Sequence, residues 1–322
     1  MADFVGHAFG NYRLTRLLGE GGFAQVYLAE HVYLGTQAAI KILDLRLGTG
    51  ELDTFYREAR TIARLTHPHI VRVLEFGVQD RTPYLVLDYA PHGTLRERYP
   101  SGTVVAPEAI LPLVQQTAAA LQYAHDQHII HRDVKPENLL LSRDDTVLLS
   151  DFGIALVAQT SRRHTAEEIL GTVAYMAPEQ LHGKPRPESD QYALGVTVYE
   201  WLSGRLPFTG TYREMALQQV MADPPSLQDQ ETPVVPALEQ VVRKARTLRS
   251  ALPVCKPLLR LLKGPIRQSQ NLQNPRNQRH LSWPHQLNAF THPGNHAPPC
   301  WLDWSSQENP GSSSGGFPGA GR

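Results

Sequence analysis

A change of periodicity near residue 90 limits the folds open to this chain of 322 residues. Before it, short β-rich runs follow one another and are broken by one helical stretch, Leu52 to Leu65. After it, long helical patterns dominate, as in AILPLVQQTAAALQYAHDQH. Strands with one helix, followed mostly by helices, predict an α+β fold of two lobes. The β-rich runs cover residues 12–20, 23–32, 36–43, 70–78 and 82–89, and the helical face holds Phe55, Ala59, Ile62 and Ala63.

Charge and cysteine content narrow the class of protein. The formal net charge is zero, so composition gives no reason to expect a nucleic acid or an acidic membrane surface as partner. Cys255 and Cys300 form no disulfide framework and fit a reducing compartment. We find neither a signal-peptide pattern nor 18 uninterrupted apolar residues. We therefore expect a cytoplasmic protein without a membrane span.

The stretch IIHRDVKPENLLL, residues 129–141, places charged residues inside an apolar run. Burying Arg132, Asp133 and Lys135 costs several kcal/mol unless the groups are paired or used. Asn138 lies five residues after Asp133, and Asp151 follows Asp133 by 18 residues. Two acids and an amide are the oxygen ligands that Mg²⁺ prefers beside phosphate. Each residue alone also suits a capped turn, but together they favour a metal and phosphate site.

Two features of the β-rich region favour phosphate binding. Gly19, Gly21 and Gly22 lie between two strand-like runs, where glycine lets a hairpin backbone approach phosphates closely. Taken alone, this pattern is more often a plain hairpin turn. Lys41 ends a strand of small apolar residues, and Glu58 lies on the helical stretch 17 residues later. A Lys41–Glu58 ion pair would position the lysine amine against phosphate oxygens, although surface charge is the simpler interpretation of Glu58.

In chain order, these motifs resemble those of the Hanks-type Ser/Thr protein kinases, closest to the bacterial branch. The resemblance covers about residues 12 to 244 and is highly specific. It implies a bilobal fold, with a small β-rich lobe at 12–90, a mostly helical lobe at 91–244 and an atypical segment at 245–322. The motifs are GEGGFAQV, AAIK, Glu58, HRDVKPEN, DFG, Ala177-Pro178-Glu179 and Asp190 in SDQYALG.

The resemblance implies ATP and Mg²⁺ as cofactors and assigns roles to the charged residues. Lys41 would contact the α- and β-phosphates and pair with Glu58. Asn138 and Asp151 would hold the metal ions. Asp133 would orient the substrate hydroxyl and accept its proton, and Lys135 would stabilise the γ-phosphate.

The resemblance also implies an adenine pocket between the lobes. Val26, Ala39 and Leu140 would contact the ring, and the backbone of Asp88 and Ala90 would supply its hydrogen bonds. Leu87 would close the rear of this pocket. A column of Ile62, Leu74, His131 and Phe152 would join the two lobes. All of these residues also suit ordinary core packing.

Further expectations concern substrate and regulation. Lys135, and Gly171-Thr172 ahead of Tyr175, resemble Ser/Thr rather than Tyr kinases, so the substrates would be protein Ser and Thr hydroxyls. Autophosphorylation in trans would involve a homodimer. Residues 151–179 would form the activation segment, in which a phosphate on Thr165 would pair with Arg132. Thr160 and Ser161 are alternative acceptors.

Three positions depart from the family pattern. Ala24 replaces the third glycine of the phosphate loop, and Thr94 replaces the acid that contacts ribose. The family's closing arginine, which would pair with Glu179, is absent from RTLRSALPVCKPLLRLLK. From Ala245 on, nine Lys or Arg face only Asp303 and Glu308. We interpret residues 245–322 as a disordered or frameshifted segment and expect the final helices of the lobe to be missing.

Two other functions are compatible with these residues. One is an inactive, truncated kinase that acts as a pseudokinase-like binding protein, because Glu179 would lack its partner. The other is a small-molecule phosphotransferase, which GTVAYMAPE disfavours because it resembles a peptide-docking segment.

Overall fold

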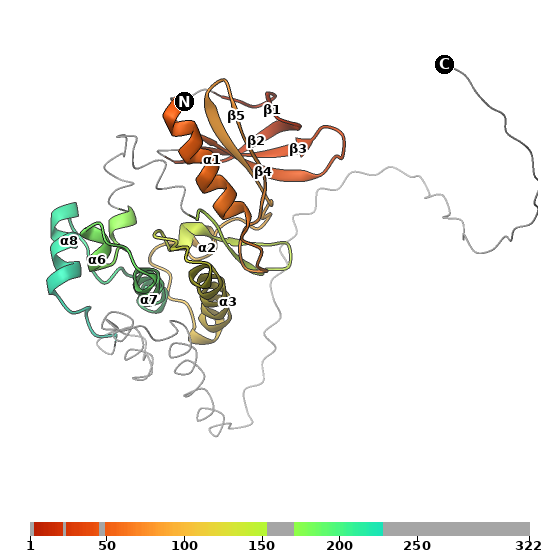
Figure 1. The fold of residues 1–322 in the computed structure, drawn as a ribbon. Coiled ribbons are helices and arrows are strands. Elements are labelled where there is room, and N and C mark those ends of the chain that lie inside the picture. Colours follow the sequence, from red (N-terminus) through yellow and green to blue (C-terminus); the bar gives the residue numbers. More distant parts are fainter. Residues whose placement is uncertain (1–2, 22–23, 45–48, 153–170, 228–322) are drawn as a thin grey trace, which may run out of the picture. The chain divides into compact units, whose positions relative to one another are not determined.

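The computed structural model describes residues 3–21, 24–44, 49–152 and 171–227, and Figure 1 shows their fold. Gly22, the acceptors Thr160, Ser161 and Thr165, and the whole segment 245–322 lie outside these residues. The expectations on them therefore stay predictions.

The first lobe is built on a six-stranded antiparallel sheet with the order β1-β2-β3-β4-β6-β5 (Figure 1). All five β-rich runs that the sequence predicted form strands. The short strand β1 was not predicted and pairs with β2 through Ala8 and Arg13. The strands are β1 (Ala8–Phe9), β2 (Tyr12–Gly21), β3 (Ala24–His31), β4 (Gln37–Leu43), β5 (Val73–Gln79) and β6 (Thr82–Leu87).

Helix α1 (Thr49–Ala63) confirms the predicted helical stretch, although it begins earlier and ends two residues sooner. Its apolar face is buried at Phe55 and Ala59, which pack with Leu43 and Leu85 of the sheet. Ile62 and Ala63 pack at the edge of the same cluster. The helix is thus held by one face, as its amphipathic pattern requires.

The second lobe confirms the predicted change to helices. Its longest helix, α3, buries an apolar stripe against α7 and β8. Every residue of α7 from Ser189 to Ser203 is buried, so this helix is the centre of the lobe. The elements are α2 (Leu95–Arg98), α3 (Pro107–Asp126), η1 (Pro136–Asn138), β7 (Leu139–Leu141), β8 (Val147–Leu149), α6 (Pro178–Leu181), α7 (Pro187–Ser203) and α8 (Tyr212–Met221).

Backbone hydrogen bonds attach the segment between α1 and β5 to β8. Val71 N–H donates to Leu149 O at 3.0 Å, and Leu149 N–H donates to His69 O at 2.9 Å. Asp151 follows the end of β8 by two residues, and its carboxylate lies 2.7 Å from Lys41 Nζ on the sheet. The two-lobed α+β fold is therefore as predicted.

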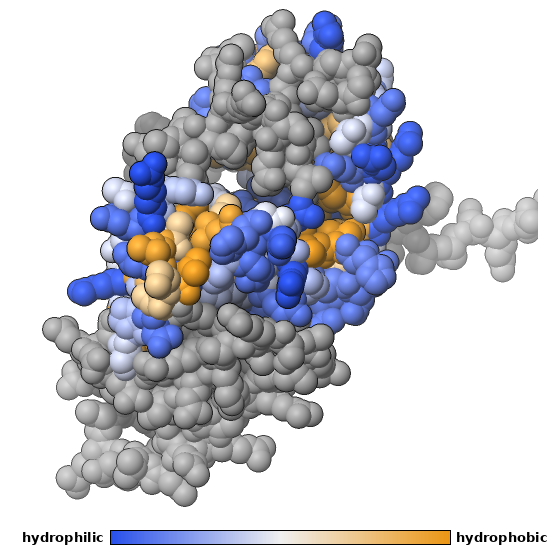
Figure 2. All heavy atoms as spheres, turned by 60° about the vertical axis from the view of Figure 1, so that its left-hand side comes forward, coloured by the Kyte–Doolittle hydropathy of each residue, from blue (hydrophilic) through white to orange (hydrophobic). Residues whose placement is uncertain are grey.

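The surface on the α6 and α8 side is mixed in character. On α8, Leu217, Val220 and Met221 are exposed. Figure 2, with this side turned forward, shows apolar side chains in separate groups between hydrophilic ones. Isolated apolar groups of this kind are ordinary on soluble domains. Among the helices that the structure describes, none has the length and apolar character needed to cross a membrane.

Candidate active site

The loop between α3 and η1, residues 129–135, is held by Asp190 of α7. The Asp190 carboxylate accepts hydrogen bonds from the backbone N–H groups of His131 at 2.8 Å and Arg132 at 2.7 Å. His125 Nε2 lies 2.7 Å from the same carboxylate. Arg132 has a φ of 72°, a left-handed conformation that costs energy in a non-glycine residue. Asp190 therefore holds the loop in a strained shape.

Asp133 lies at the centre of a polar cluster built by this loop. Asn138 Nδ2 donates to the Asp133 backbone carbonyl at 2.7 Å and to its Oδ2 at 2.9 Å. Lys135 Nζ lies 3.0 Å from the same Oδ2. The structure thus brings two of the predicted site residues, Asn138 and Lys135, within hydrogen-bonding distance of the carboxylate of a third, Asp133.

Ser150 connects this loop to Asp151. Ser150 N–H and Oγ–H both donate to Asn138 O, at 2.9 and 3.1 Å. His131 Nε2 lies 2.6 Å from Ser150 O. These bonds fix the chain on both sides, so that Asn138 and Asp151 are held as neighbours. Asp151 has a φ of 66°, a second strained non-glycine residue at this site.

Lys41 reaches Asp151 from the sheet. Its Nζ lies 2.7 Å from Asp151 Oδ1. Burial raises the pKa of Asp151, but the charge and hydrogen bond of Lys41, with His131 and Lys135, outweigh burial and lower the pKa below its usual value. Asp151 is therefore ionised at neutral pH.

Glu58 does not contact Lys41 in this structure. Among the described residues, the ion pair of Lys41 is with Asp151, and the buried Oε2 of Glu58 has no hydrogen-bond partner. Burial raises the pKa of Glu58, and the charges of Arg57 and Arg132 oppose this rise. In this structure Lys41 therefore pairs with Asp151 instead of the predicted Glu58.

Strand register places the other predicted phosphate and adenine contacts beside Lys41. Gly19 is opposite Val26, and Val26 is opposite Lys41. Ala39 is two residues before Lys41 and is opposite Leu87. Directly opposite residues share a face of the sheet, and so do residues two apart. One face therefore carries this whole set. Gly21 is opposite Ala24 at the end of the same hairpin.

The segment after β6 supplies the predicted hinge. Asp88 N–H donates to Arg72 O at 3.0 Å, so its carbonyl is the group left to meet a ligand. Ala90 makes no backbone hydrogen bond to another described residue. Leu140 lies close by, because Leu141 N–H donates to Gly93 O and Leu140 forms a bridge with Thr94.

One member of the predicted apolar column is wrong. Leu74 is 40% exposed, whereas its neighbour Val73 is 9% exposed and packs with Leu85 and Phe55. A register shift in β5 between Val73 and Glu75 turns Leu74 away from the core. The His131 and Phe152 rings, by contrast, lie 4.6 Å apart between centroids.

Residues 171–180 contact the same loop. Lys135 Nζ donates to Thr172 Oγ1 at 3.0 Å, and Gln180 Nε2 donates to Arg132 O at 2.6 Å. Glu179 accepts a hydrogen bond from Ser189 Oγ at 2.6 Å. The described partner of Glu179 is thus a hydroxyl group rather than an arginine.

Sequence reasoning missed a second charged cluster around Arg96 on α2. Its guanidinium contacts Glu137 in η1, Glu200 in α7 and Tyr175. These partners are 41, 104 and 79 residues from Arg96 in the chain, and no local pattern connects them. Glu137 and Tyr175 lay in the motifs HRDVKPEN and GTVAYMAPE, whereas Arg96 and Glu200 lay in none.

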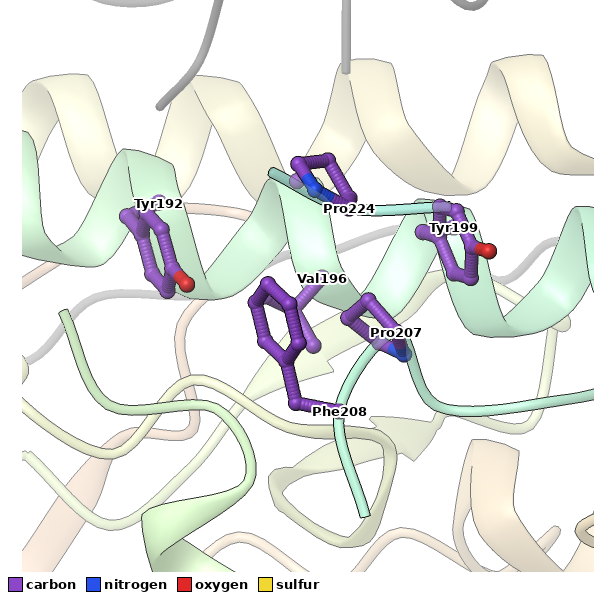
Figure 3. A pocket seen from close by; sticks show the side chains of 7 residues that line it. Tyr192, Val196, Tyr199, Pro207, Phe208 and Pro224 are labelled. Atoms are coloured by element: carbon purple, nitrogen blue, oxygen red, sulfur yellow. The ribbon is translucent and has the colours of Figure 1, made fainter. Parts of the chain in front are cut away.

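A small apolar pocket lies elsewhere, against α7, and Figure 3 shows its aromatic and proline side chains. The described residues that line it carry no carboxylate, amide or lysine group, so it does not belong to the candidate active site. The lining consists of Tyr192, Gly195, Val196, Tyr199, Pro207, Phe208 and Pro224.

Comparison with known proteins agrees with this geometry. Residues 12–267 match the family model described as protein kinase domain. The chain is 36% identical to the Ser/Thr-protein kinase PrkC of Bacillus subtilis over 241 residues, which are 73% of this chain and 37% of that protein. It is 39% identical to pkn2 of Myxococcus xanthus over 235 residues, which are 70% of this chain and 28% of that one.

A solved structure of a kinase domain has a similar fold. The PknI kinase domain of Mycobacterium tuberculosis, crystallised as a mutant, matches with a TM-score of 0.62 at 28% identity, covering 81% of this chain and 98% of that one. The chain spans well under two thirds of the length of the curated relatives above. The family match also extends past residue 244, where the sequence predicted the end of the lobe.

Proposed function

The chain belongs to the protein kinase family, and on that premise we propose that it is an ATP-dependent Ser/Thr protein kinase. It transfers the γ-phosphate of ATP to Ser and Thr hydroxyls of proteins. One observation carries the proposal. Asn138 and Lys135 contact Asp133, Lys41 contacts Asp151, and Ser150, the neighbour of Asp151, bonds to Asn138 and so connects the two groups.

Nucleotide binding rests on the sheet and the hinge. Val26 and Ala39 cover the adenine from the sheet, and Leu140 covers it from below. The Asp88 carbonyl accepts a hydrogen bond, and the Ala90 N–H donates one. Gly19, Gly21 and Gly22 bring backbone close to the phosphates. On nucleotide binding, Lys41 leaves Asp151, contacts the α- and β-phosphates and forms an ion pair with Glu58.

The donor set suits Mg²⁺. Asn138 Nδ2 donates its hydrogen bonds to Asp133, so Asn138 Oδ1 is available for a cation. Asp151 uses Oδ1 for Lys41 and keeps Oδ2. One oxygen from each residue, beside phosphate oxygens, is the environment that Mg²⁺ prefers. When bound, the cation neutralises charge on the phosphates.

The chain's own residues orient the transfer. Asp133 receives a hydrogen bond from the substrate hydroxyl and accepts its proton as oxygen bonds to the γ-phosphorus. The bond from that phosphorus to the β–γ bridging oxygen breaks, and ADP leaves. Lys135 already lies beside Asp133 and Thr172, and it stabilises charge on the transferred group.

The test is phosphoryl transfer by the full chain. We expect label from Mg·[γ-³²P]ATP to appear in casein on phosphoserine and phosphothreonine, and not on phosphotyrosine. Asp133→Asn keeps the shape of the side chain but loses the base, and we expect a loss of about 10²-fold or more. Binding of Mg·ATP without any transfer by the wild type would contradict the proposal and favour the inactive alternative.

Two further proposals concern a second copy of the chain as partner and the location of the protein in the cell. We propose that two copies phosphorylate each other in trans, which predicts a rate of autophosphorylation that rises with protein concentration. A rate constant independent of concentration would contradict it. Cytoplasmic location stays a prediction from composition.

A further inference from the structure

All five N–H groups of the Arg96 guanidinium are used. Nε donates to Glu137 Oε1 at 2.7 Å. Nη1 donates to Glu200 Oε1 at 2.7 Å and to Ser101 Oγ at 2.9 Å. Nη2 donates to Tyr175 Oη at 2.6 Å and to Glu200 Oε2 at 3.1 Å. A planar fork with five donors is the only side chain that can make this set of bonds.

The partners of Arg96 come from three separate parts of the site. Glu137 belongs to η1 and precedes Asn138 directly. Tyr175 lies three residues after Thr172, which contacts Lys135. Glu200 belongs to the buried helix α7. One guanidinium thus connects the catalytic loop, the segment at 171–176 and the centre of the lobe.

The helix that carries Arg96 is itself fixed. Thr94 caps α2, accepting from Glu97 N–H at 3.0 Å, while Glu97 Oε2 accepts from Thr94 N–H at 2.9 Å. This capping box sets where α2 begins. Arg96 therefore projects from a rigid position just after the hinge.

Arg96 and Tyr175 are both shifted toward their protonated forms. Burial lowers the pKa of Arg96, but its bonds to Glu200, with Tyr175 and Glu137, raise the pKa far above the usual value. Burial, followed by the Glu200 charge, raises the pKa of Tyr175. The phenol therefore stays neutral and donates to Glu200 Oε2 at 2.5 Å.

We propose that Arg96 is a positioning residue for the protein substrate. It acts through Tyr175, holding residues 171–176 at the distance from the catalytic loop at which a polypeptide presents its hydroxyl to Asp133. Lys135–Thr172 is the second connection between the same two segments. Arg96 contacts none of the residues proposed to bind ATP. This inference rests on the proposed kinase function.

The test separates substrate KM, ATP KM and kcat in the full chain. The substrate is one Ser/Thr peptide chosen from a degenerate library because the wild type phosphorylates it. We expect Arg96→Met to raise the peptide KM about tenfold or more, since it removes several charged hydrogen bonds. The ATP KM should change less than about twofold. Arg96→Lys should recover only part of the loss, because an ammonium cannot bridge all the acceptors.

The matched control is Arg98→Met on the same helix. Arg98 bonds to Asp145 at the surface, and its side chain is 43% exposed. We expect unchanged KM values. If the wild type and this control phosphorylate no peptide, the proposed function fails and this inference fails with it. If both are active and Arg96→Met keeps the wild-type peptide KM, only this inference is overturned.

Tyr175→Phe keeps the test decisive if Arg96→Met does not fold. This variant removes one hydroxyl group and should raise the peptide KM in the same direction by a smaller factor. Combined with Arg96→Lys, it should add little, because both changes act on one connection. Fully additive effects, or an equal rise in peptide and ATP KM, would show a merely structural role and overturn the inference.

Discussion

Asp190 and Glu58 are both carboxylates beside the candidate active site, but their surroundings differ sharply. Asp190 accepts two backbone hydrogen bonds and lies against His125, all within the helical lobe. Glu58 lies on α1, and its buried Oε2 has no partner among the described residues. One carboxylate is fully satisfied by the protein, whereas the other is not.

This difference shows which part of the site is held by the protein's own hydrogen bonds, without a ligand. Buried polar groups that are fully hydrogen-bonded make a rigid arrangement, and those left unpaired cost free energy. The attachment of the loop to Asp190 is therefore complete in the isolated chain, although Arg132 Nε on this loop has no partner among the described residues. On the sheet side, Lys41 contacts Asp151 and Glu58 Oε2 has no described partner, so under the proposed function we expect nucleotide binding to complete this end of the site.

Removing the Asp190 carboxylate should have the largest predicted effect on stability. Asp190→Ala leaves the His131 and Arg132 amides without an acceptor in the core, and breaking a buried charged group of this kind costs about 3–5 kcal/mol. We expect the free energy of unfolding, measured with urea, to fall by this amount. Asp126→Ala, at an exposed position where Asp126 accepts a hydrogen bond from Gln122, is the control and should change little. A small loss for Asp190→Ala would contradict the anchoring role.

The apolar contacts below the sheet give the next effect. Val73→Ala should lower the free energy of unfolding by about 1–3 kcal/mol, because it removes buried methyl groups. Leu74→Ala should change it by less than about 0.5 kcal/mol, because the side chain is already exposed. Equal losses in urea titrations of the two variants would show that the register shift in β5 is not as described.

A smaller effect concerns Lys41 and Asp151 and depends on pH. Asp151 has a pKa below its usual value, so the stability it contributes is present above about pH 4 and is lost as pH falls through the folded-state pKa. Lys41→Met should therefore lower stability at pH 7 and match the wild type more closely below pH 4. Exposed Lys184→Met is the control. A stability difference between Lys41→Met and the wild type that grows as the pH falls would contradict the lowered pKa of Asp151.

The smallest effect should have the opposite sign. Glu58 has a raised pKa, so its contribution favours folding below the unfolded-state pKa of about 4.3 and is lost as pH rises through the folded-state value. At pH 7, Glu58→Gln removes a buried charge and should slightly raise the melting temperature. The gain should disappear near pH 4. A clear loss of stability at pH 7 would mean that Glu58 is paired after all.

The sequence predicted this molecule well where the signal is local. Periodicity predicted the strands, α1 and the long helices, and motifs predicted the cluster around Asp133. It predicted less well where the contact depends on packing. Because of a register shift in β5, Val73 rather than Leu74 is buried. Lys41 pairs with Asp151 rather than with Glu58. Arg96 and its partners were missed because only the folded chain brings them together.

The measurement that most directly tests the contrast between the two ends is amide hydrogen exchange of the full chain, with and without a non-hydrolysable Mg·ATP analogue. We expect the amides of His131 and Arg132, which donate to Asp190, to be protected in both states. Segments carrying Lys41 and Glu58 should gain protection only with the nucleotide. Rapid exchange at His131 and Arg132 until nucleotide is added would contradict a catalytic loop built by the protein alone.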